Sequence, residues 1–265
     1  MTYYKNKTVW ITGASSGIGK EMAIQLSGMG ASLILSSRKK SSLEEVARLC
    51  KSTTVNLLPL DLEDHDNLDK ILSDNKSLIS TVDILINNGG ISQRSKVIET
   101  SFEVYKRLMD INYFGTIKLS KGILPYFLGR NSGHFVVVSS MAGKFGVPVR
   151  SGYSASKMAL HGFFDALRAE LASTNINTTI ICPGYIKTDI SKNALTSDGS
   201  PQGTMDEAQR NGMAVDTMVK KVLQAVASGK AEYHVGRFKE VKMAGLVARL
   251  MPNLLRKIIA KSKVT

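Results

Sequence analysis

Short apolar runs alternate with longer amphipathic segments along most of this chain. Seven runs of four to six residues are rich in β-branched and aromatic side chains, and several lack polar alternation, which is typical of strands buried on both faces of a parallel sheet. The longer segments repeat apolar positions every three or four residues, as amphipathic helices do. The predicted strands are 8–12, 32–36, 54–58, 83–87, 134–139, 178–182 and 232–235, and the predicted helices are 17–29, 41–51, 65–79, 101–129, 152–173 and 214–228.

This order of elements predicts an α/β fold with a single doubly wound, Rossmann-like domain: a mostly parallel seven-stranded sheet with helices on both faces. We expect this domain to span residues 1–236. Residues 187–213 are polar and rich in Gly, Ser and Asp, which indicates a lid or binding loop within it. Residues 237–265 form a basic, amphipathic C-terminal helical extension, and we expect Pro252 to break its helix.

The distribution of charge adds a functional hint to this extension. The chain carries a net charge of +13, and its last 37 residues hold nine basic and two acidic side chains, a net +7. Such a localised excess indicates an anionic surface or ligand. Three interpretations remain open: the tail packs on the sheet or on a second subunit, lies on an anionic membrane, or gates a lipid entrance. A nucleic-acid partner is not expected, because no recognised motif for one is present.

Other features narrow the class of protein. No stretch of about 18 apolar residues occurs and the start lacks a signal-peptide pattern, so we expect a cytoplasmic protein, with peripheral membrane contact through the tail left open. The four histidines are scattered without a paired metal-binding motif, which predicts no metal. With only two cysteines, a disulfide framework is not expected.

The stretch "TGASSGIG", residues 12–19, follows the first predicted strand and opens the first helix. Its glycines permit a tight turn, and the free N–H groups at a helix start attract a pyrophosphate, although the spacing differs from the G-x-G-x-x-G dinucleotide fingerprint. After the second strand, Arg38 stands where NAD-binding proteins place an acidic residue. A guanidinium can bind a 2′-phosphate with two charge-assisted hydrogen bonds, so we predict NADP(H) rather than NAD(H).

The stretch "YSASK" places Tyr153 and Lys157 four residues apart on a predicted helix, and therefore on one face of it. A free phenol has a pKa of about 10, too high for efficient proton transfer near neutral pH. A neighbouring ammonium favours the phenolate and lowers that pKa. Tyr153 is therefore the candidate general acid for reducing a carbonyl and general base for oxidising an alcohol.

Taken in order, these motifs resemble the short-chain dehydrogenase/reductase superfamily over residues 7 to about 235. The resemblance rests on "TGASSGIG", "DL" at 61–62, "NNGG" at 87–90, Asn112, "VSSMAG" at 138–143, "YSASK" and "PGYIKT" at 183–188. Within the superfamily, residues 183–200 and the basic tail look similar to the dehydrogenase/reductase member-seven group. The resemblance implies a homodimer or homotetramer formed through helices 101–129 and 152–173.

The resemblance also implies roles for individual residues. Lys157 would tune Tyr153 and bind the nicotinamide ribose, Ser140 would hydrogen-bond the substrate oxygen in preference to its neighbour Ser139, and Asn112 would hold a water beside the lysine. The catalytic candidates are thus Asn112, Ser140, Tyr153 and Lys157. Position 89 is glycine where most relatives have alanine, which we expect to loosen that turn slightly.

The cofactor candidates follow from the same motifs. Asp61 would lie near the adenine amino group, Asn88 near the adenosine ribose, and Ile186 and Thr188 near the nicotinamide carboxamide. The full predicted set is Gly13, Ser15, Ser16, Gly17, Ile18, Gly19, Arg38, Asp61, Leu62, Asn88, Tyr153, Lys157, Ile186 and Thr188.

Substrate selection is expected from residues 92–100, 143–152 and 187–213, whose side chains include the apolar Phe145, Val147, Pro148, Val149 and Ile190. This set favours a hydrophobic ketone or aldehyde over a sugar, and the member-seven resemblance suggests a steroid, retinoid or acylated lipid ketone. We therefore expect an NADP(H)-dependent oxidoreductase that interconverts a hydrophobic ketone and its secondary alcohol. The alternative is a non-catalytic NADP(H)-binding sensor or scaffold.

Overall fold

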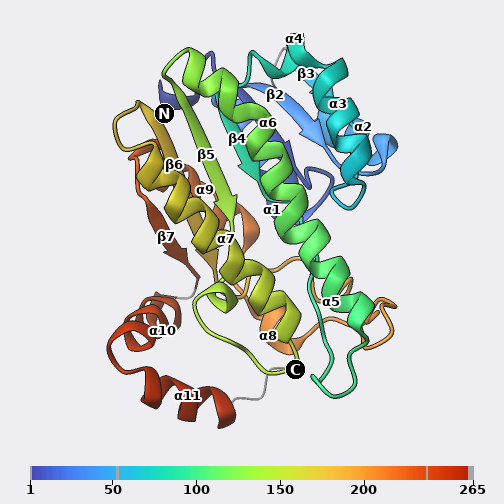
Figure 1. Cartoon of the computed structure of the whole chain (residues 1–265), viewed down its shortest axis with the longest axis vertical. Helices are drawn as coiled ribbons and strands as arrows, with labels where there is room; N and C mark the ends of the chain where they lie inside the picture. Colours follow the sequence, from blue (N-terminus) through green and yellow to red (C-terminus); the bar gives the residue numbers. More distant parts are fainter. Residues whose placement is uncertain (1, 52–53, 237, 262–265) are drawn as a thin grey trace.

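The computed structural model describes residues 2–51, 54–236 and 238–261, and its centre is a seven-stranded sheet (Figure 1). All neighbouring strands run parallel. The predicted fold class is confirmed, with the sheet parallel throughout. In sheet order the strands are β3 (Val55–Leu57), β2 (Ser32–Ser36), β1 (Thr8–Thr12), β4 (Ile84–Asn87), β5 (Gly133–Val138), β6 (Ile176–Pro183) and β7 (Glu232–Val235).

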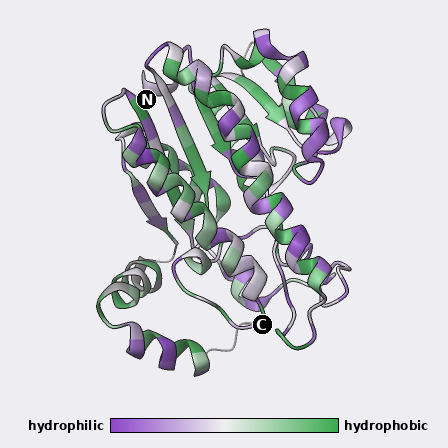
Figure 2. Ribbon diagram, viewed as in Figure 1, coloured by the Kyte–Doolittle hydropathy of each residue, from purple (hydrophilic) through white to green (hydrophobic). Residues whose placement is uncertain are grey.

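Side-chain alternation along each strand builds two apolar cores, one on each face of the sheet. In β1, Val9 and Ile11 join the core on one face and Trp10 joins the core on the other. The central strands β4 and β5 are accordingly hydrophobic along their length (Figure 2). Helices α1 (Gly17–Gly28), α2 (Lys40–Leu49) and α9 (Val215–Ala227) cover the first face, and α3 (His65–Asp74), α4 (Lys76–Ile79), α6 (Gly115–Gly129) and α7 (Ser151–Glu170) cover the second.

The order of strands reverses direction between β1 and β4, which continue outward to β2 and β5 respectively. In open α/β sheets, ligands bind at this switch point, outside the carboxyl ends of the strands. The glycine-rich turn follows β1, and the "NNGG" turn follows β4. The fold therefore places both motifs at the edge where a nucleotide is expected.

Three predicted elements differ in detail. The helix predicted at 101–129 consists of α5 (Phe102–Met109), a π-helical turn (Asp110–Phe114) and α6, and the helix predicted at 65–79 breaks at Asn75 into α3 and α4. In the π turn the Gly115 N–H donates to the Asp110 carbonyl, five residues back. The expected lid, 187–213, contains one short helix, α8 (Glu207–Arg210).

The C-terminal extension forms α10 (Phe238–Leu250) and α11 (Pro252–Lys261), so the predicted break at Pro252 is observed. Proline starts a helix readily, because the first turn needs no partner for its N–H group. The two helices lie beyond the carboxyl end of β7, at the bottom of Figure 1. Residues 237 and 262–265 of the predicted extension lie outside the described residues. Within 2–51, 54–236 and 238–261, no helix has the length and apolarity needed to span a membrane.

Candidate active site

Glycines bring the turn after β1 against the turn after β4. Gly13 has a φ of +63°, a conformation that favours glycine, and a Cβ there would lie 2.8 Å from the Gly89 Cα. Gly19 faces Gly13 and the Asn88 side chain, so its role is close packing. The Asn88 amide holds this arrangement by donating to the carbonyls of Thr12 (3.0 Å) and Gly13 (3.3 Å).

A cleft of about 570 Å³ runs across the switch point. Among its lining residues are ten of the fourteen predicted cofactor residues: Gly13, Ser15, Ser16, Gly17, Ile18, Arg38, Asp61, Leu62, Asn88 and Thr188. Ile186, Tyr153 and Lys157 line a second, adjoining cavity, and Gly19 lies behind the turn. Ile18, Asn88, Gly90, Thr188 and Ile190 line both spaces, which are therefore continuous.

Residues at the far end of the cleft offer groups that could hold a phosphate. At its far end, the buried Ser37 hydroxyl has no hydrogen-bond partner within the described part of the chain, and the exposed Arg38 stands beside it. Buried polar atoms normally have partners, so an orphaned hydroxyl indicates a missing ligand atom. The glycine turn, Ser37 and Arg38 together fit a dinucleotide that carries a phosphate on its adenosine ribose.

The expected loosening at Gly89 is not observed. A Cβ at this position would lie 2.6 Å from Leu62 Cδ1 and 3.3 Å from Thr12 Oγ1. The Leu62 side chain therefore occupies the space that an alanine methyl would need, and the turn stays packed without it.

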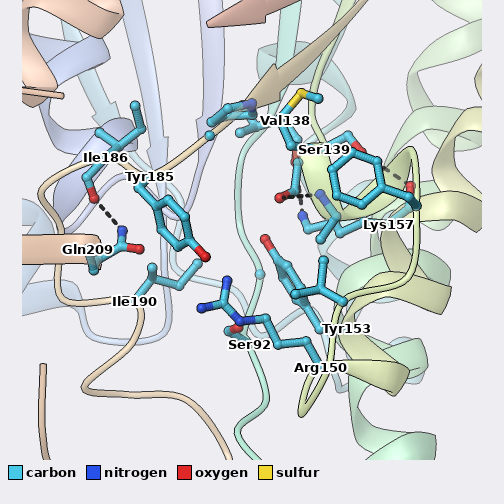
Figure 3. A pocket seen from close by; sticks show the side chains of 18 of the residues that line it. Ser92, Val138, Ser139, Arg150, Tyr153, Lys157, Tyr185, Ile186, Ile190 and Gln209 are labelled. Carbon is cyan, nitrogen blue, oxygen red and sulfur yellow. Dashed lines mark hydrogen bonds between the residues drawn. The ribbon is translucent and has the colours of Figure 1, made fainter. Parts of the chain in front are cut away.

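The second cavity, of about 320 Å³, holds the chemical end of the site (Figure 3). Tyr153 lies on the first turn of α7, and its side chain points into this cavity together with Arg150 and Lys157. Apolar side chains form much of the remaining wall. They include Val138, Met141, Phe145, Val147, Ile186, Ile190, Leu255 and Ile258.

The electrostatics of Tyr153 differ from the sequence expectation. Burial raises the pKa of the phenol, while a hydrogen bond with Ser140 and the positive charges of Arg150 and Arg94 oppose that rise. Lys157 Nζ instead donates to the Val138 carbonyl at 2.9 Å and lies 5.9 Å from the centre of the Tyr153 ring. The guanidinium groups of Arg150 and Arg94 are therefore the charges that favour the phenolate.

Lys157 is itself buried and only 4 % exposed. Burial disfavours its charged form and lowers the pKa of the ammonium to about 8. The group therefore remains mostly protonated at neutral pH, close to the point at which its charge can be lost.

The two candidate serines are separated by their hydrogen bonds. Ser139 Oγ donates to the Lys157 carbonyl at 3.2 Å and lies 3.1 Å from His161 Nε2, facing away from Tyr153. Ser140 Oγ accepts a hydrogen bond from the Ala142 N–H at 3.1 Å, and its interaction with the phenol lowers the pKa of Tyr153. The geometry therefore favours Ser140 as the partner of a substrate oxygen.

Asn112 lies in the π turn and is fully buried. Its Oδ1 accepts from the Ile91 N–H (2.8 Å), and its Nδ2 donates to the Ile91 carbonyl (3.0 Å) and to Ser156 Oγ (2.9 Å). Gly90 lies between it and Lys157, since a Cβ on Gly90 would be 2.8 Å from Asn112 Oδ1 and 3.4 Å from Lys157 Nζ. The side chain thus fixes the loop after β4 beside Lys157. The water that Asn112 was expected to hold remains a prediction.

Gln93, which the sequence analysis did not single out, binds the backbone at Tyr153. This fully buried side chain follows β4, and its Oε1 accepts from the backbone N–H groups of Gly152 (2.8 Å) and Tyr153 (3.3 Å). Its Nε2 donates to Ser95 Oγ and Thr100 Oγ1 at 3.2 Å each. Gln93 therefore provides acceptors for N–H groups that the first turn of a helix leaves unsatisfied.

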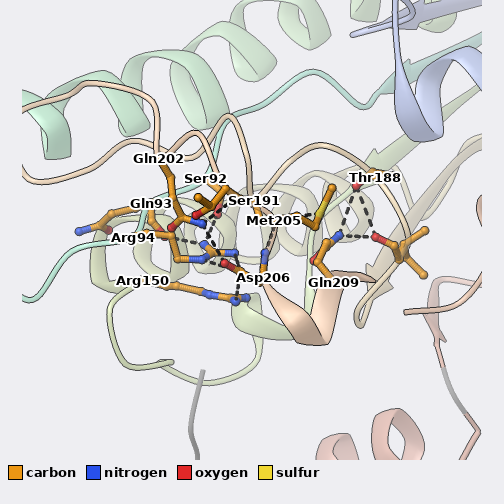
Figure 4. Close-up of polar contacts among 12 residues, drawn as sticks. Ser92, Gln93, Arg94, Arg150, Thr188, Ser191, Gln202, Met205, Asp206 and Gln209 are labelled. Carbon is orange, nitrogen blue, oxygen red and sulfur yellow. Dashed lines mark hydrogen bonds and ion pairs between the residues drawn. The ribbon is translucent and has the colours of Figure 1, made fainter. Parts of the chain in front are cut away.

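A buried charge cluster joins residues 187–213, the predicted lid, to the residues of the cavity wall (Figure 4). Asp206 of the lid accepts from Arg94 Nε at 2.8 Å and from Arg150 Nη2 at 3.2 Å, and Gln202 Nε2 donates to its other oxygen at 2.9 Å. Burial works against the carboxylate, but these partners hold the pKa of Asp206 below its usual value. Two guanidinium groups thus share one carboxylate on the cavity wall, which leaves a net positive charge near Tyr153.

The structure also assembles a polar cluster that the sequence pattern did not reveal. One possible metal-ligand atom from each of Cys182, Glu232 and His234 lies within 4.8 Å of the other two. His161 is adjacent to Cys182 and Glu232. Hydrogen bonds from His161, His234 and Lys144 hold the pKa of Glu232 far below its usual range. The cluster is thus a network around the Glu232 carboxylate. His161 and His234 lie close to it together although they are far apart in the sequence.

Comparisons with known proteins agree with this geometry. The family model for short chain dehydrogenases matches residues 7–199. A Drosophila melanogaster protein, dehydrogenase/reductase SDR family protein 7-like, is 40 % identical over 264 residues, covering 97 % of this chain and 81 % of the fly protein. The Homo sapiens dehydrogenase/reductase SDR family member 7 is 41 % identical over 231 residues, covering 84 % of this chain and 68 % of its own.

Solved structures show the same architecture. A short chain dehydrogenase from Burkholderia cenocepacia in complex with NADP matches with a TM-score of 0.79 and 25 % identity, covering 96 % of this chain and 98 % of the other. A short-chain dehydrogenase from Sphingobium yanoikuyae in complex with NADPH matches with a TM-score of 0.75 and 24 % identity, covering 98 % and 97 %.

Proposed function

This chain belongs to the short-chain dehydrogenase/reductase family of oxidoreductases, and we propose that it uses NADP(H) to interconvert a hydrophobic ketone and its secondary alcohol. The resemblance to the superfamily and its member-seven group, expected from the motifs, is confirmed by these relatives. The observation that carries the proposal is the buried Tyr153 side chain, which lines a largely apolar cavity together with Ser140 and Lys157 where this cavity adjoins the glycine-lined cleft.

NADP(H) is the proposed cofactor because of the residues at the far end of the cleft. Ser37 and Arg38 line the cleft after the second strand, the position predicted to contact the adenosine ribose. Two structural neighbours are complexes with NADP or NADPH. When bound, the cofactor supplies the hydride of the reaction. The residues that would hold it are the ten that line the cleft, with Tyr153, Lys157 and Ile186 at the nicotinamide end.

The proton is the protein's contribution to the chemistry. In reduction, Tyr153 donates its hydroxyl proton to the substrate oxygen as the carbonyl carbon receives the hydride, and a phenolate remains. In oxidation the phenolate takes the proton back. Ser140 hydrogen-bonds the same substrate oxygen, and the charges of Arg150 and Arg94 stabilise the phenolate between the two states.

The cavity wall favours an apolar substrate. Its lining includes Met141, Phe145, Val147, Ile186 and Ile190, together with Leu255 and Ile258 of the C-terminal helices. Burial of such surface stabilises an apolar ligand by roughly 25 cal/mol per Å². A hydrophobic ketone is therefore a better match than a sugar, as the sequence suggested.

The test is NADPH oxidation by the purified full chain across a panel of steroid, retinoid and acylated lipid ketones. Turnover that produces the matching secondary alcohol is expected for at least one class. NADPH binding without turnover of any ketone would contradict the proposal and favour a cofactor-binding sensor.

Replacing Arg38 with alanine should reduce the preference for NADPH over NADH by roughly 10- to 100-fold, because a charge-assisted hydrogen bond contributes about 1.5 to 3 kcal/mol. The measurement is kcat/KM with each cofactor and one ketone. Lys40→Ala is the matched control, because Lys40 is an exposed basic residue of the same turn that does not line the cleft. Equal effects of the two variants, or none, would contradict the assignment.

Replacing Arg150 with methionine should raise the pKa of Tyr153, because a positive charge that favours the phenolate is removed. Alcohol oxidation requires the phenolate, so the rising limb of its pH profile should shift to higher pH. Arg150→Lys keeps the charge and should shift the profile less. The measurement is kcat/KM for oxidation against pH, and an unmoved limb in Arg150→Met would show that the guanidinium does not act on the phenol.

A further inference from the structure

The two C-terminal helices are seated on the body at a defined place. Val241 of α10 is buried against Gly184 and Gly236, and a Cβ on Gly184 would lie 2.7 Å from Val241 Cγ2. Gly245 packs against the His234 ring, where a Cβ would lie 2.6 Å from Cε1. These close contacts fix the orientation of α10 relative to the end of β7.

The inner side of the helices forms part of the substrate cavity. Ala244 of α10 and Leu255, Ile258 and Ile259 of α11 line the same space as Tyr153. The C-terminal helices therefore form one wall of the reaction chamber, and whatever their outer side contacts is separated from the chamber by these helices alone.

The outer side is apolar and uncovered. Five large apolar side chains that do not line the cavity are 42–66 % exposed, although this segment is a small part of the molecule: Met243, Leu246, Leu250, Met251 and Leu254. Met243, Leu246 and Leu250 are three or four residues apart and share one face of α10, and Met251 and Leu254 follow at the junction with α11; we call these five side chains the outer stripe. Exposed apolar patches of this kind mark interaction surfaces.

The charge of the two helices is mostly positive. Residues 238–261 contain six basic residues and one acidic residue, and Arg256, Lys257 and Lys261 on α11 are exposed. A second copy of this surface would bring the same positive charges face to face, which opposes a contact between two tails. An apolar stripe with basic flanks instead complements the acyl chains and headgroups of an anionic bilayer.

We infer that α10 and α11 dock the protein on an anionic lipid surface through the outer stripe and its basic flanks. Docking in this orientation places the entrance of the Tyr153 cavity at the lipid, so that an apolar substrate enters from the bilayer. The second half of this inference rests on the proposed function, whereas the docking itself does not.

The test is flotation of the full chain with two kinds of vesicle, phosphatidylcholine mixed with phosphatidylserine and phosphatidylcholine alone. The wild-type chain should float with the mixed vesicles and much less with the neutral ones. The triple substitution Leu246→Glu, Leu250→Glu and Leu254→Glu should weaken binding at least about tenfold, because it removes buried apolar area and adds repulsion from anionic headgroups.

Two further variants keep this test decisive. Val97→Glu, Ile98→Glu and Phe102→Glu make the same number of changes at exposed apolar residues far from the tail in sequence, and should leave flotation unchanged. Arg256→Gln, Lys257→Gln and Lys261→Gln alter only exposed side chains of α11 and should abolish the preference for anionic vesicles. Unfolding curves and NADPH binding report whether each variant is intact.

Several results would overturn the docking. These are absent flotation of the wild type, equal binding to both kinds of vesicle, or equal losses in the two glutamate triples when both are folded. A change in oligomeric state caused only by the tail triple, with no vesicle binding, would show that a second copy covers the stripe. If flotation holds but vesicles do not affect turnover of a membrane-dissolved ketone, the proposed entry route fails and the docking stands.

Discussion

Tyr153→Phe should lower kcat/KM for ketone reduction by about 10²- to 10⁴-fold, the usual contribution of a positioned general acid. The substitution removes one oxygen from a buried ring and leaves the packing of α7 intact. NADPH binding, followed by fluorescence titration, should change little, because the glycine turn and Arg38 lie in the neighbouring cleft.

Tyr185→Phe is the matched control for this experiment. Tyr185 lines the same cavity, and its ring packs near Arg150 rather than Ser140, so the same loss of a hydroxyl should change kcat/KM only a few-fold. Comparable activity in Tyr153→Phe and wild type would rule out Tyr153 as the proton donor. A similar loss in both variants would indicate that phenols in this cavity contribute to substrate binding instead.

Asp206→Asn should destabilise the folded chain by about 3 to 5 kcal/mol, because it removes the carboxylate between two buried guanidinium groups. For a domain of this size, such a loss lowers the melting temperature by roughly 6 to 20 °C. The lid should also detach from Arg94 and Arg150, so KM for the ketone should rise. Thermal unfolding and steady-state kinetics measure the two effects.

Asp198→Asn provides the control within the same segment, because Asp198 is exposed and its hydrogen bonds are to Thr196 and Ser200 of its own turn. Its effect on the melting temperature should be small. The pH dependence gives a second check. The folded-state pKa of Asp206 is lowered, so its contribution to stability is present above about pH 4, the usual range of the group, and is lost as pH falls toward the folded value. The difference in the free energy of unfolding between wild type and Asp206→Asn should therefore become smaller in acid. A constant difference would contradict the stabilising role of the Asp206 carboxylate.

The strands and the cofactor cleft could be predicted because their signals are local. A run such as residues 83–87 carries its own burial pattern, and "TGASSGIG" supplies its turn residues within eight positions. The i and i+4 spacing of Tyr153 and Lys157 likewise places both on one side of α7. Each of these inferences needed only a neighbour in the sequence.

The parts that were missed depend on distant contacts. Arg94 and Arg150 meet Asp206 across 112 and 56 positions of sequence, so their partnership becomes visible only when the lid folds over the site. The sequence named the Lys157 ammonium as the group that acts on Tyr153, whereas burial and the guanidinium groups of Arg150, three residues before it, and of the distant Arg94 shift its pKa. The π turn at Asn112 was missed because the helix was predicted from an α-helical period alone, and π turns are rare.

Gln93 has a consequence for redesigning substrate preference. Its side chain joins the loop after β4, which carries Ser92 and Arg94 on the cavity wall, to the backbone of Tyr153 itself. Swapping residues 92–100 for a loop from another enzyme would therefore displace the reactive hydroxyl as well as reshape the chamber. A graft that keeps Gln93 and its two hydroxyl partners, Ser95 and Thr100, retains the anchor from which the helix starts. A change at the Gln93 amide is therefore expected to alter both the choice of substrate and proton transfer by Tyr153.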